Sequence, residues 1–188
     1  GTVAGQSTFN YGDFVKYNGM SANAKLSFYD IGNTATESLE LPNDINVDLF
    51  SVQYASGARI FSNSWGTPKQ NQYSLRCLNA DLFMYEKQDA LVLFAGGNDG
   101  DIGTKGERTI GSPGGAKNVL TVGATLSANE VFKAFPTSVP DGVTDIFSQT
   151  KLAYFSSQGP MKDGRIKPEI LAPGWWTTSA MGTTGFTD

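Results

Sequence analysis

Apolar residues recur along this chain with two different spacings, and each spacing predicts a different kind of element. Alternation over residues 24–30 predicts a strand that runs into a loop at Gly32 and Asn33. Residues 59–63 and 119–124 have the same strand-like character. Residues 90–95 are apolar without interruption, which is typical of a strand buried on both faces. The pattern therefore predicts four strands.

Between these strands, apolar residues follow the spacing of helices. Asn43 or Asp44 can cap a helix that Gly57 ends. The expected apolar face of this helix consists of Ile45, Leu49, Val52 and Ala55. A second amphipathic stretch has its apolar residues at Leu75, Leu78, Leu82, Met84 and Tyr85. Strands that alternate with helices of this length predict an α/β fold, with a mostly parallel central sheet and helices on both faces.

The length and punctuation of the chain indicate one domain. A chain of 188 residues suits a single domain, and we find no internal repeat. Residues 127–150 are irregular and include Pro136, Pro140 and Gly142, so we expect a surface excursion there. No strand precedes the opening residues, and the chain trails off after a proline-rich turn. We therefore expect residues 1–188 to be part of a larger domain.

Charge and composition narrow the classes of function. The chain has 14 Lys+Arg against 18 Asp+Glu, a net charge of −4, and no basic run, so nucleic acid is an unexpected partner. No apolar run reaches the 18 residues typical of a membrane span. Because the sequence has no histidine, it contains no Ser-His pair and no imidazole metal ligand. Cys77 is the single cysteine, cannot form an internal disulfide, and is expected to be buried.

Two further features have ordinary interpretations. The glycine-rich segment 96–100 follows a buried strand, but a G-x-G-x-x-G frame fails because its later positions hold Asn98 and Asp101. Nucleotide binding is therefore not expected. A group of acidic residues could supply oxygen ligands to a structural calcium ion, although a solvated surface is the favoured interpretation. These residues are Asp81, Glu86, Asp89, Asp99 and Asp101. We assign no metal ligand.

Four short blocks, taken in order, carry the strongest signal. They are Ser62-Asn-Ser-Trp-Gly66, Phe94-Ala-Gly-Gly-Asn-Asp-Gly100, Gly111-Ser-Pro113, and the segment from Phe155-Ser-Ser157 through Asp163-Gly-Arg-Ile-Lys-Pro-Glu169 to Ala172-Pro-Gly174. In this order the blocks resemble the subtilisin-like serine proteases, and most closely the large secreted bacterial and protist members. The resemblance covers most of the chain and implies a three-layer subtilisin-like fold, of which residues 1–188 are the central part.

The resemblance implies a role for nine residues. Asn98 matches the side-chain donor of the oxyanion hole, whose amide faces the oxygen that becomes negative when the acyl carbon turns tetrahedral. The substrate-binding residues implied by the family are Ser64, Trp65, Gly66, Ala95, Gly96, Gly97, Gly111 and Ser112. The first three form an edge that pairs with extended substrate, the next three form the opposite wall of the primary pocket, and the last two close its bottom. Trp175 and Trp176 are expected in the core.

The implied activity is peptide-bond hydrolysis by a secreted endopeptidase that needs no cofactor. The family places its triad in the order Asp, His, Ser, and the positions of all three fall outside these residues, so the chain alone is predicted to be inert. Thr184 stands where a Gly-Thr-Ser motif would need serine, and we interpret that segment as a loop. Two alternatives remain. One is a peptide-binding relative without a triad, and the other is a sedolisin-type peptidase with Asp99 at the oxyanion position.

Overall fold

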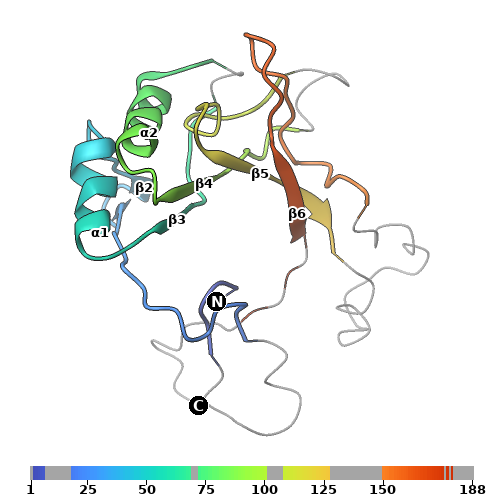
Figure 1. Ribbon diagram of the computed structural model, residues 1–188. Coiled ribbons are helices and arrows are strands. Elements are labelled where there is room, and N and C mark those ends of the chain that lie inside the picture. The colour runs from blue at the N-terminus through green and yellow to red at the C-terminus, as the bar shows by residue number, and fades with distance from the viewer. Residues whose placement is uncertain are drawn as a thin grey trace, which may run out of the picture.

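A four-stranded parallel sheet forms the centre of this computed structural model, which describes residues 2–6, 18–68, 72–100, 108–127 and 150–175, together with Thr177 and Ser179. The strands are β3 (Ile60–Asn63), β4 (Leu91–Ala95), β5 (Leu120–Leu126) and β6 (Ile170–Trp175), in the spatial order β3-β4-β5-β6. Figure 1 shows these strands side by side, with the helices grouped beside β3 and β4. The α/β class and the parallel sheet are confirmed.

The described helices pack on one face of the sheet and build the main core with it, whereas the sequence predicts helices on both faces. They are the π-helical segment η2 (Asn46–Phe50), which continues into α1 (Ser51–Ala55), and α2 (Leu75–Glu86). Phe50 of η2, Phe61 of β3 and Phe83 of α2 are buried together, with ring centroids 5.1–5.6 Å apart. Aromatic rings at this separation add attraction beyond their burial. This three-ring contact fixes both helices to the sheet.

The first helix begins and ends as expected but buries a different face. The Asp44 carboxylate accepts the N–H groups of Asn46 and Val47, at 2.9 and 3.2 Å, and Gly57 ends the helix with φ of +106°. Val52, however, is 54% exposed, which corrects the expected face of Ile45, Leu49, Val52 and Ala55. The wide π turn, in which Phe50 N–H donates to Ile45 O, rotates later residues, so that Phe50 and Gln53 join Ile45 and Leu49 inside.

The second helix also turns a different face to the core. Leu75, Leu78 and Leu82 are 67%, 42% and 42% exposed, so the expected apolar face points outward. The buried apolar residues are instead Cys77, Ala80 and Phe83, at intervals of three, and Asn79 and Asp81 are buried as well. Small side chains at the first two positions let the helix approach the sheet closely. The expectation that Cys77 is buried is confirmed.

The predicted strand over residues 24–30 is wrong. These residues have no regular secondary structure, Leu26 is 73% exposed and Phe28 is 86% exposed, and no described strand pairs with them. A strand needs a neighbour for its backbone hydrogen bonds, and the alternating pattern alone does not supply one. The chain forms a small antiparallel hairpin just afterwards, from β1 (Gly32–Asn33) and β2 (Ser38–Leu39).

The hairpin strands β1 and β2 and the sheet strand β6 were missed, and one strand is less buried than expected. β6 contains Pro173, which removes a backbone donor, but β6 lies at the edge of the sheet where such a donor is dispensable.

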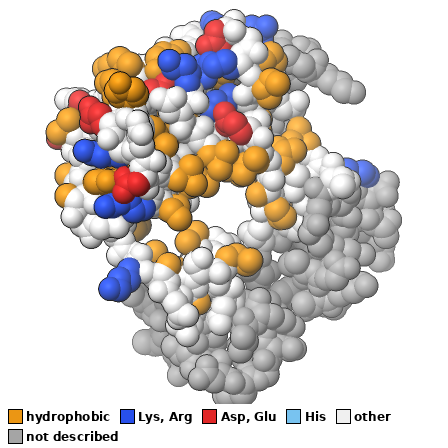
Figure 2. Space-filling model, viewed as in Figure 1, with side chains coloured by type: hydrophobic (Ala, Val, Ile, Leu, Met, Phe, Trp, Pro, Cys, Tyr) orange, Lys and Arg blue, Asp and Glu red, His pale blue; other side chains and the backbone are white. Residues whose placement is uncertain are grey.

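In β4, Val92 and Phe94 are buried whereas Leu91 is 39% exposed, so the described residues cover mainly one face of the strand. Figure 2 shows hydrophobic side chains along the rim of an opening between the sheet and the N-terminal segment.

Several expectations concern the remaining parts of the chain. Trp175 is partly buried, with its ring 5.3 Å from that of Tyr154 and 6.4 Å from that of Phe155, in keeping with a packing role. Trp176, most of the expected excursion over 127–150, and Thr184 lie outside the described residues. In the part of the chain that the structure describes, no helix has the length and hydropathy needed to cross a membrane.

Candidate functional site

Two neighbouring strands, β3 and β4, end at the same edge of the sheet, and the residues that follow them form the candidate site. The parallel ladder between β3 and β4 ends at the pair Asn63 and Phe94. The side-chain amide of Asn63 donates to Leu93 O at 3.1 Å, which fastens the two strand ends to each other. Residues 64–66 and 96–100 therefore leave the sheet as adjacent loops. The carboxyl edge of a parallel sheet is where α/β proteins usually bind ligands.

The loop around Ser112 joins these two segments. Gly111 N–H donates to Gly96 O at 2.9 Å, and Thr67 and Ser112 exchange two backbone hydrogen bonds, each of 2.9 Å. These bonds connect the chain after β3, the chain after β4 and the loop before β5. Such long-range backbone bonds hold the relative positions of three segments that are far apart in the sequence.

A cavity of about 300 Å³ lies between these three segments. Its lining includes eight of the nine residues that the family resemblance singled out. They are Ser64, Trp65, Gly66, Ala95, Gly97, Asn98, Gly111 and Ser112. The ninth, Gly96, is buried behind the wall, where its N–H donates to Val122 O at 2.9 Å. The structure thus brings the candidate residues around one cavity, with Gly96 supporting it.

The loop that carries Asn98 is anchored on both sides of that residue. Ser157 N–H donates to Gly97 O at 3.1 Å, and Asp99 N–H donates to Ser157 Oγ at 3.0 Å. Gly97 has φ of +117°, and a Cβ there would lie 2.7 Å from Ser157 Oγ, so only glycine suits this position. Asn98 is exposed between two fixed neighbours. Asn98 therefore lines the cavity from a turn that is held on both sides.

The opposite wall depends on a close approach and on one aromatic side chain. A Cβ on Gly66 would lie 2.8 Å from Ser112 O, so a larger residue would push the two walls apart. The Trp65 indole N–H donates to Asn63 Oδ1 at 3.1 Å, and its ring packs edge-on against Phe94 with centroids 5.1 Å apart. Trp65 is thus held in place by the strand ends while it lines the cavity.

The cavity carries little charge. Asp99 is the one ionisable side chain among the described residues that line it. A neutral amide such as that of Asn98 can donate hydrogen bonds without gaining or losing a proton, which suits a site where negative charge develops on a ligand.

The acidic residues do not form a metal centre in the described residues, where no group of three or more His, Cys, Asp or Glu side chains converges. Asp81 also departs from the expected solvent-facing surface, because it is buried and accepts hydrogen bonds from Tyr73, Lys117 and Asn118. Asp89 is exposed and pairs with Arg59. Asp101 lies outside the described residues.

Three lining residues were missed at the sequence level: Leu39, Thr67 and Pro68. Thr67 follows directly from the strand-end segment, so extending that segment by one residue would have found it. Leu39 comes from β2, and nothing in its sequence surroundings distinguishes it from other exposed leucines. It reaches the cavity only through the fold of the hairpin.

Comparisons with known proteins identify the family of this chain. The model of the subtilase family matches residues 1–187. The chain is 24% identical over 223 residues to the serine protease/ABC transporter B family protein tagD of Dictyostelium discoideum, covering 87% of this chain and 12% of that protein. It is 33% identical over 102 residues to pyrolysin of Pyrococcus furiosus, covering 51% of this chain and 7% of pyrolysin. Serine protease AprX of Bacillus subtilis is 37% identical over 84 residues, which cover 45% of this chain and 15% of AprX.

These curated relatives are much longer than the part that matches. A solved structure of the prenylagaramide maturation protease PagA is also similar, with a TM-score of 0.45 and 24% identity over 73% of this chain and 39% of that one.

Proposed function

Because this chain belongs to the subtilase family, we propose that the intact protein is a serine-type endopeptidase and that residues 1–188 are the central part of its peptidase domain. The observation that carries the proposal is the position of Asn98, on a braced turn at a cavity that Ser64 and Ser112 also line. This arrangement suits a peptide held between two walls with its carbonyl oxygen beside an uncharged donor.

In the proposed complex, an extended peptide lies between residues 64–66 and 95–97 as an additional strand. Gly66 and Gly97 line the two walls on either side of the peptide, and Gly111 and Ser112 close the pocket for the side chain before the cleaved bond. The Asn98 amide donates to the carbonyl oxygen as this oxygen becomes negative. Because the donor is in place before the reaction, it stabilises the tetrahedral state at little reorganisation cost.

The bond-breaking groups must come from outside this sequence. A serine Oγ attacks the carbonyl carbon, a histidine accepts its proton and returns it to the leaving amine, and water then hydrolyses the acyl-enzyme. The sequence has no histidine, so these residues cannot assemble that triad, and we expect the isolated 188-residue chain to be inert. The reaction uses no cofactor, and a bound calcium ion would serve the fold.

The relatives named as serine proteases favour a polypeptide substrate, and the family resemblance favours secretion. Two alternatives make different demands on the same cavity. A relative without a triad would bind peptide without cleaving it. A sedolisin-type enzyme would rely on Asp99, which lines the cavity beside Asn98.

The test uses the intact protein and the 188-residue chain side by side. Each is incubated with a fluorogenic peptide, with and without a serine-directed fluorophosphonate. We expect the intact protein to cleave the peptide and to lose this activity when the fluorophosphonate labels it. The 188-residue chain should neither cleave the peptide nor become labelled. Peptide binding by the intact protein without cleavage or labelling would reject the enzyme in favour of the binding module.

A further inference from the structure

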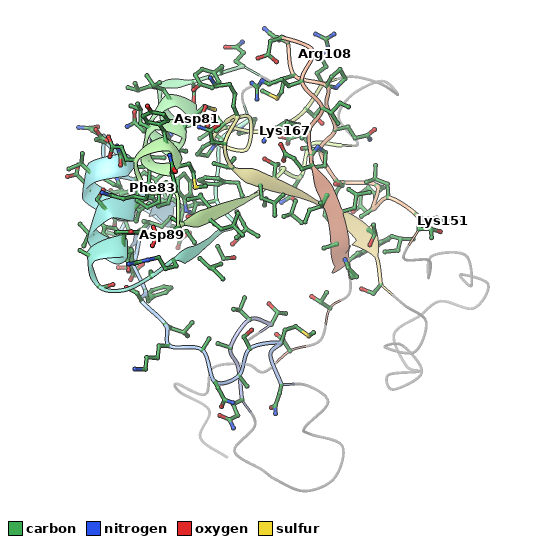
Figure 3. All side chains as sticks on the ribbon, in the orientation of Figure 1. Asp81, Phe83, Asp89, Arg108, Lys151 and Lys167 are labelled. Carbon is green, nitrogen blue, oxygen red and sulfur yellow. The ribbon has the colours of Figure 1, made fainter. Side chains whose placement is uncertain are left out.

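A buried lysine lies next to the first residues of β5. The side chain of Lys167 is 1% exposed, and its Nζ donates to Val119 O and to Thr121 Oγ1, each at 3.1 Å. Its charge is paired with Glu169, whose Oε1 lies 2.5 Å away. Figure 3 shows Lys167 beside the sheet at the beginning of β5. A buried ammonium group is costly unless it is fully paired, and here both charge and hydrogen bonds are satisfied.

Burial lowers the pKa of Lys167, and Glu169 partly opposes that shift. Glu169 also holds the strand itself, because its Oε2 accepts the backbone N–H of Thr121 at 2.7 Å. Lys167 therefore bonds the side chain of Thr121, and Glu169 bonds its backbone.

The hydroxyl of Thr121 connects Lys167 to the turn behind the cavity by two hydrogen bonds. An ammonium group can only donate, so Thr121 Oγ1 must accept from Lys167, and its own hydrogen is free to donate. It does so to Gly114 O, at 2.5 Å. The direction of both bonds is therefore determined by the chemistry of the lysine.

Gly114 belongs to the turn that carries Gly111 and Ser112, two lining residues of the cavity. A Cβ on Gly114 would lie 3.2 Å from both Ala95 O and Gly111 O, so the turn is packed against the walls. The next carbonyl, Gly115 O, accepts from Arg165 Nη1 at 3.0 Å. Two successive carbonyls behind the wall are therefore held, Gly114 O by Thr121 and Gly115 O by Arg165.

We propose that Thr121, held by Lys167 and Glu169, is a positioning residue that fixes the Gly111–Ser112 wall and so sets the side-chain selectivity of the pocket. This inference rests on the proposed function, since selectivity has meaning only if the cavity binds a peptide. Thr121 touches no substrate. It acts through Gly114. Displacement of Gly114 would move Gly111 and Ser112, and the pocket would then discriminate less between substrate side chains of different size.

The chain offers a matched control on the same strand. Thr125 is 5% exposed on β5, and its hydroxyl has no hydrogen-bond partner among the described residues. Thr121→Val and Thr125→Val make the same change on the same strand, but only the first removes a hydroxyl that bonds Gly114 O and Lys167 Nζ. Thr121→Ser keeps the hydroxyl and serves as the rescue variant.

The test has two readouts in the intact protein. The first is hydrogen exchange at the amides of Gly111 and Ser112, which donate to Gly96 O and Thr67 O. The second is the ratio of kcat/KM values for peptide p-nitroanilides that differ only in the residue before the scissile bond. We expect Thr121→Val to speed hydrogen exchange at Gly111 and Ser112. The ratio of kcat/KM between the better and the poorer substrate should fall by about fivefold, the factor that one ordinary hydrogen bond represents. Thr125→Val should change neither, and Thr121→Ser should restore both.

Unchanged exchange and an unchanged ratio in Thr121→Val, with a loss of stability like that of Thr125→Val, would overturn the inference. If Thr121→Val does not fold, Arg165→Gln removes the neighbouring bond to Gly115 O at a partly exposed position and should speed the same exchange. If the wild-type protein cleaves no peptide, the proposed function fails and selectivity fails with it. The exchange rates then decide separately whether Thr121 fixes the wall.

Discussion

Asp81 and Asn118 hold each other by two hydrogen bonds: the Asp81 carboxylate accepts Asn118 N–H at 2.7 Å, and the Asn118 side-chain amide donates to Asp81 O at 3.2 Å. The same carboxylate accepts Lys117 N–H at 3.1 Å. Asp81 is buried on α2, and the segment it holds leads directly into β5. This pair therefore connects the helix layer to the strand that supports the cavity wall.

Asp81→Asn should lower the free energy of unfolding of the intact protein by about 2–3 kcal/mol. The amide that replaces one oxygen would face a backbone N–H, and the buried donors would lose a charged acceptor. Urea unfolding measures the change. Asp89→Asn is the control, because Asp89 is exposed and its ion pair with Arg59 should contribute little. Equal effects of the two substitutions would show that Asp81 is not a structural anchor.

Phe83→Ala should cost about 3–5 kcal/mol of unfolding free energy, because it opens a cavity where three aromatic rings meet. Leu75→Ala, on the outward face of the same helix, should cost about 0.5 kcal/mol or less. Thermal or urea unfolding of both variants gives the comparison. A larger loss for Leu75→Ala would mean that the outward leucines are packed in the intact protein.

The contribution of Lys167 to stability should rise with pH in the alkaline range. Its pKa in the folded protein is lowered from 10.5 by burial, so between the two pKa values the unfolded chain binds more protons. Raising the pH through this window therefore favours the folded state. In urea unfolding at several pH values up to 10, the free energy of unfolding should have a more positive slope against pH in the wild-type protein than in Lys167→Met. Identical slopes would contradict the assignment.

Gly97→Ala should reduce kcat/KM for peptide hydrolysis strongly. The new Cβ meets Ser157 Oγ and the residue must keep a positive φ, so the turn that presents Asn98 has to move. Gly164→Ala is the matched control, because Gly164 also has positive φ, at +86°, but no atom within 4 Å of the new Cβ. Steady-state kinetics should separate the two, and equal losses would mean that backbone strain alone is responsible.

Local patterns were enough to predict three of the four strands of the parallel sheet and the caps of the first helix. The apolar runs of β3, β4 and β5 are short and bounded by polar or glycine residues, and Asp44 and Gly57 act on their immediate neighbours. The helix faces were predicted wrongly for a physical reason. A π turn rotated the first helix, and in α2 small residues, rather than leucines, allow the closest approach to the sheet.

For the candidate site, too, local sequence predicts some features and not others. Its motif residues could be named from the sequence because each block is local. The bonds that assemble them are not local: Thr67 pairs with Ser112, and Lys167 reaches Thr121 across 46 positions. No periodicity encodes such contacts, so the support of the wall became visible only in the structure.

The central claim is that Asn98 stabilises the oxyanion, and kcat for peptide hydrolysis by the intact protein with Asn98→Ala or Asp99→Asn tests it most directly. The account predicts that Asn98→Ala lowers kcat by about 10²–10³-fold, the loss seen when such a donor is removed from a subtilisin, with little change in KM. Asp99→Asn should keep kcat close to that of the wild type, since Asp99 is anchored through its backbone. Full activity in Asn98→Ala together with a large loss in Asp99→Asn would contradict the account.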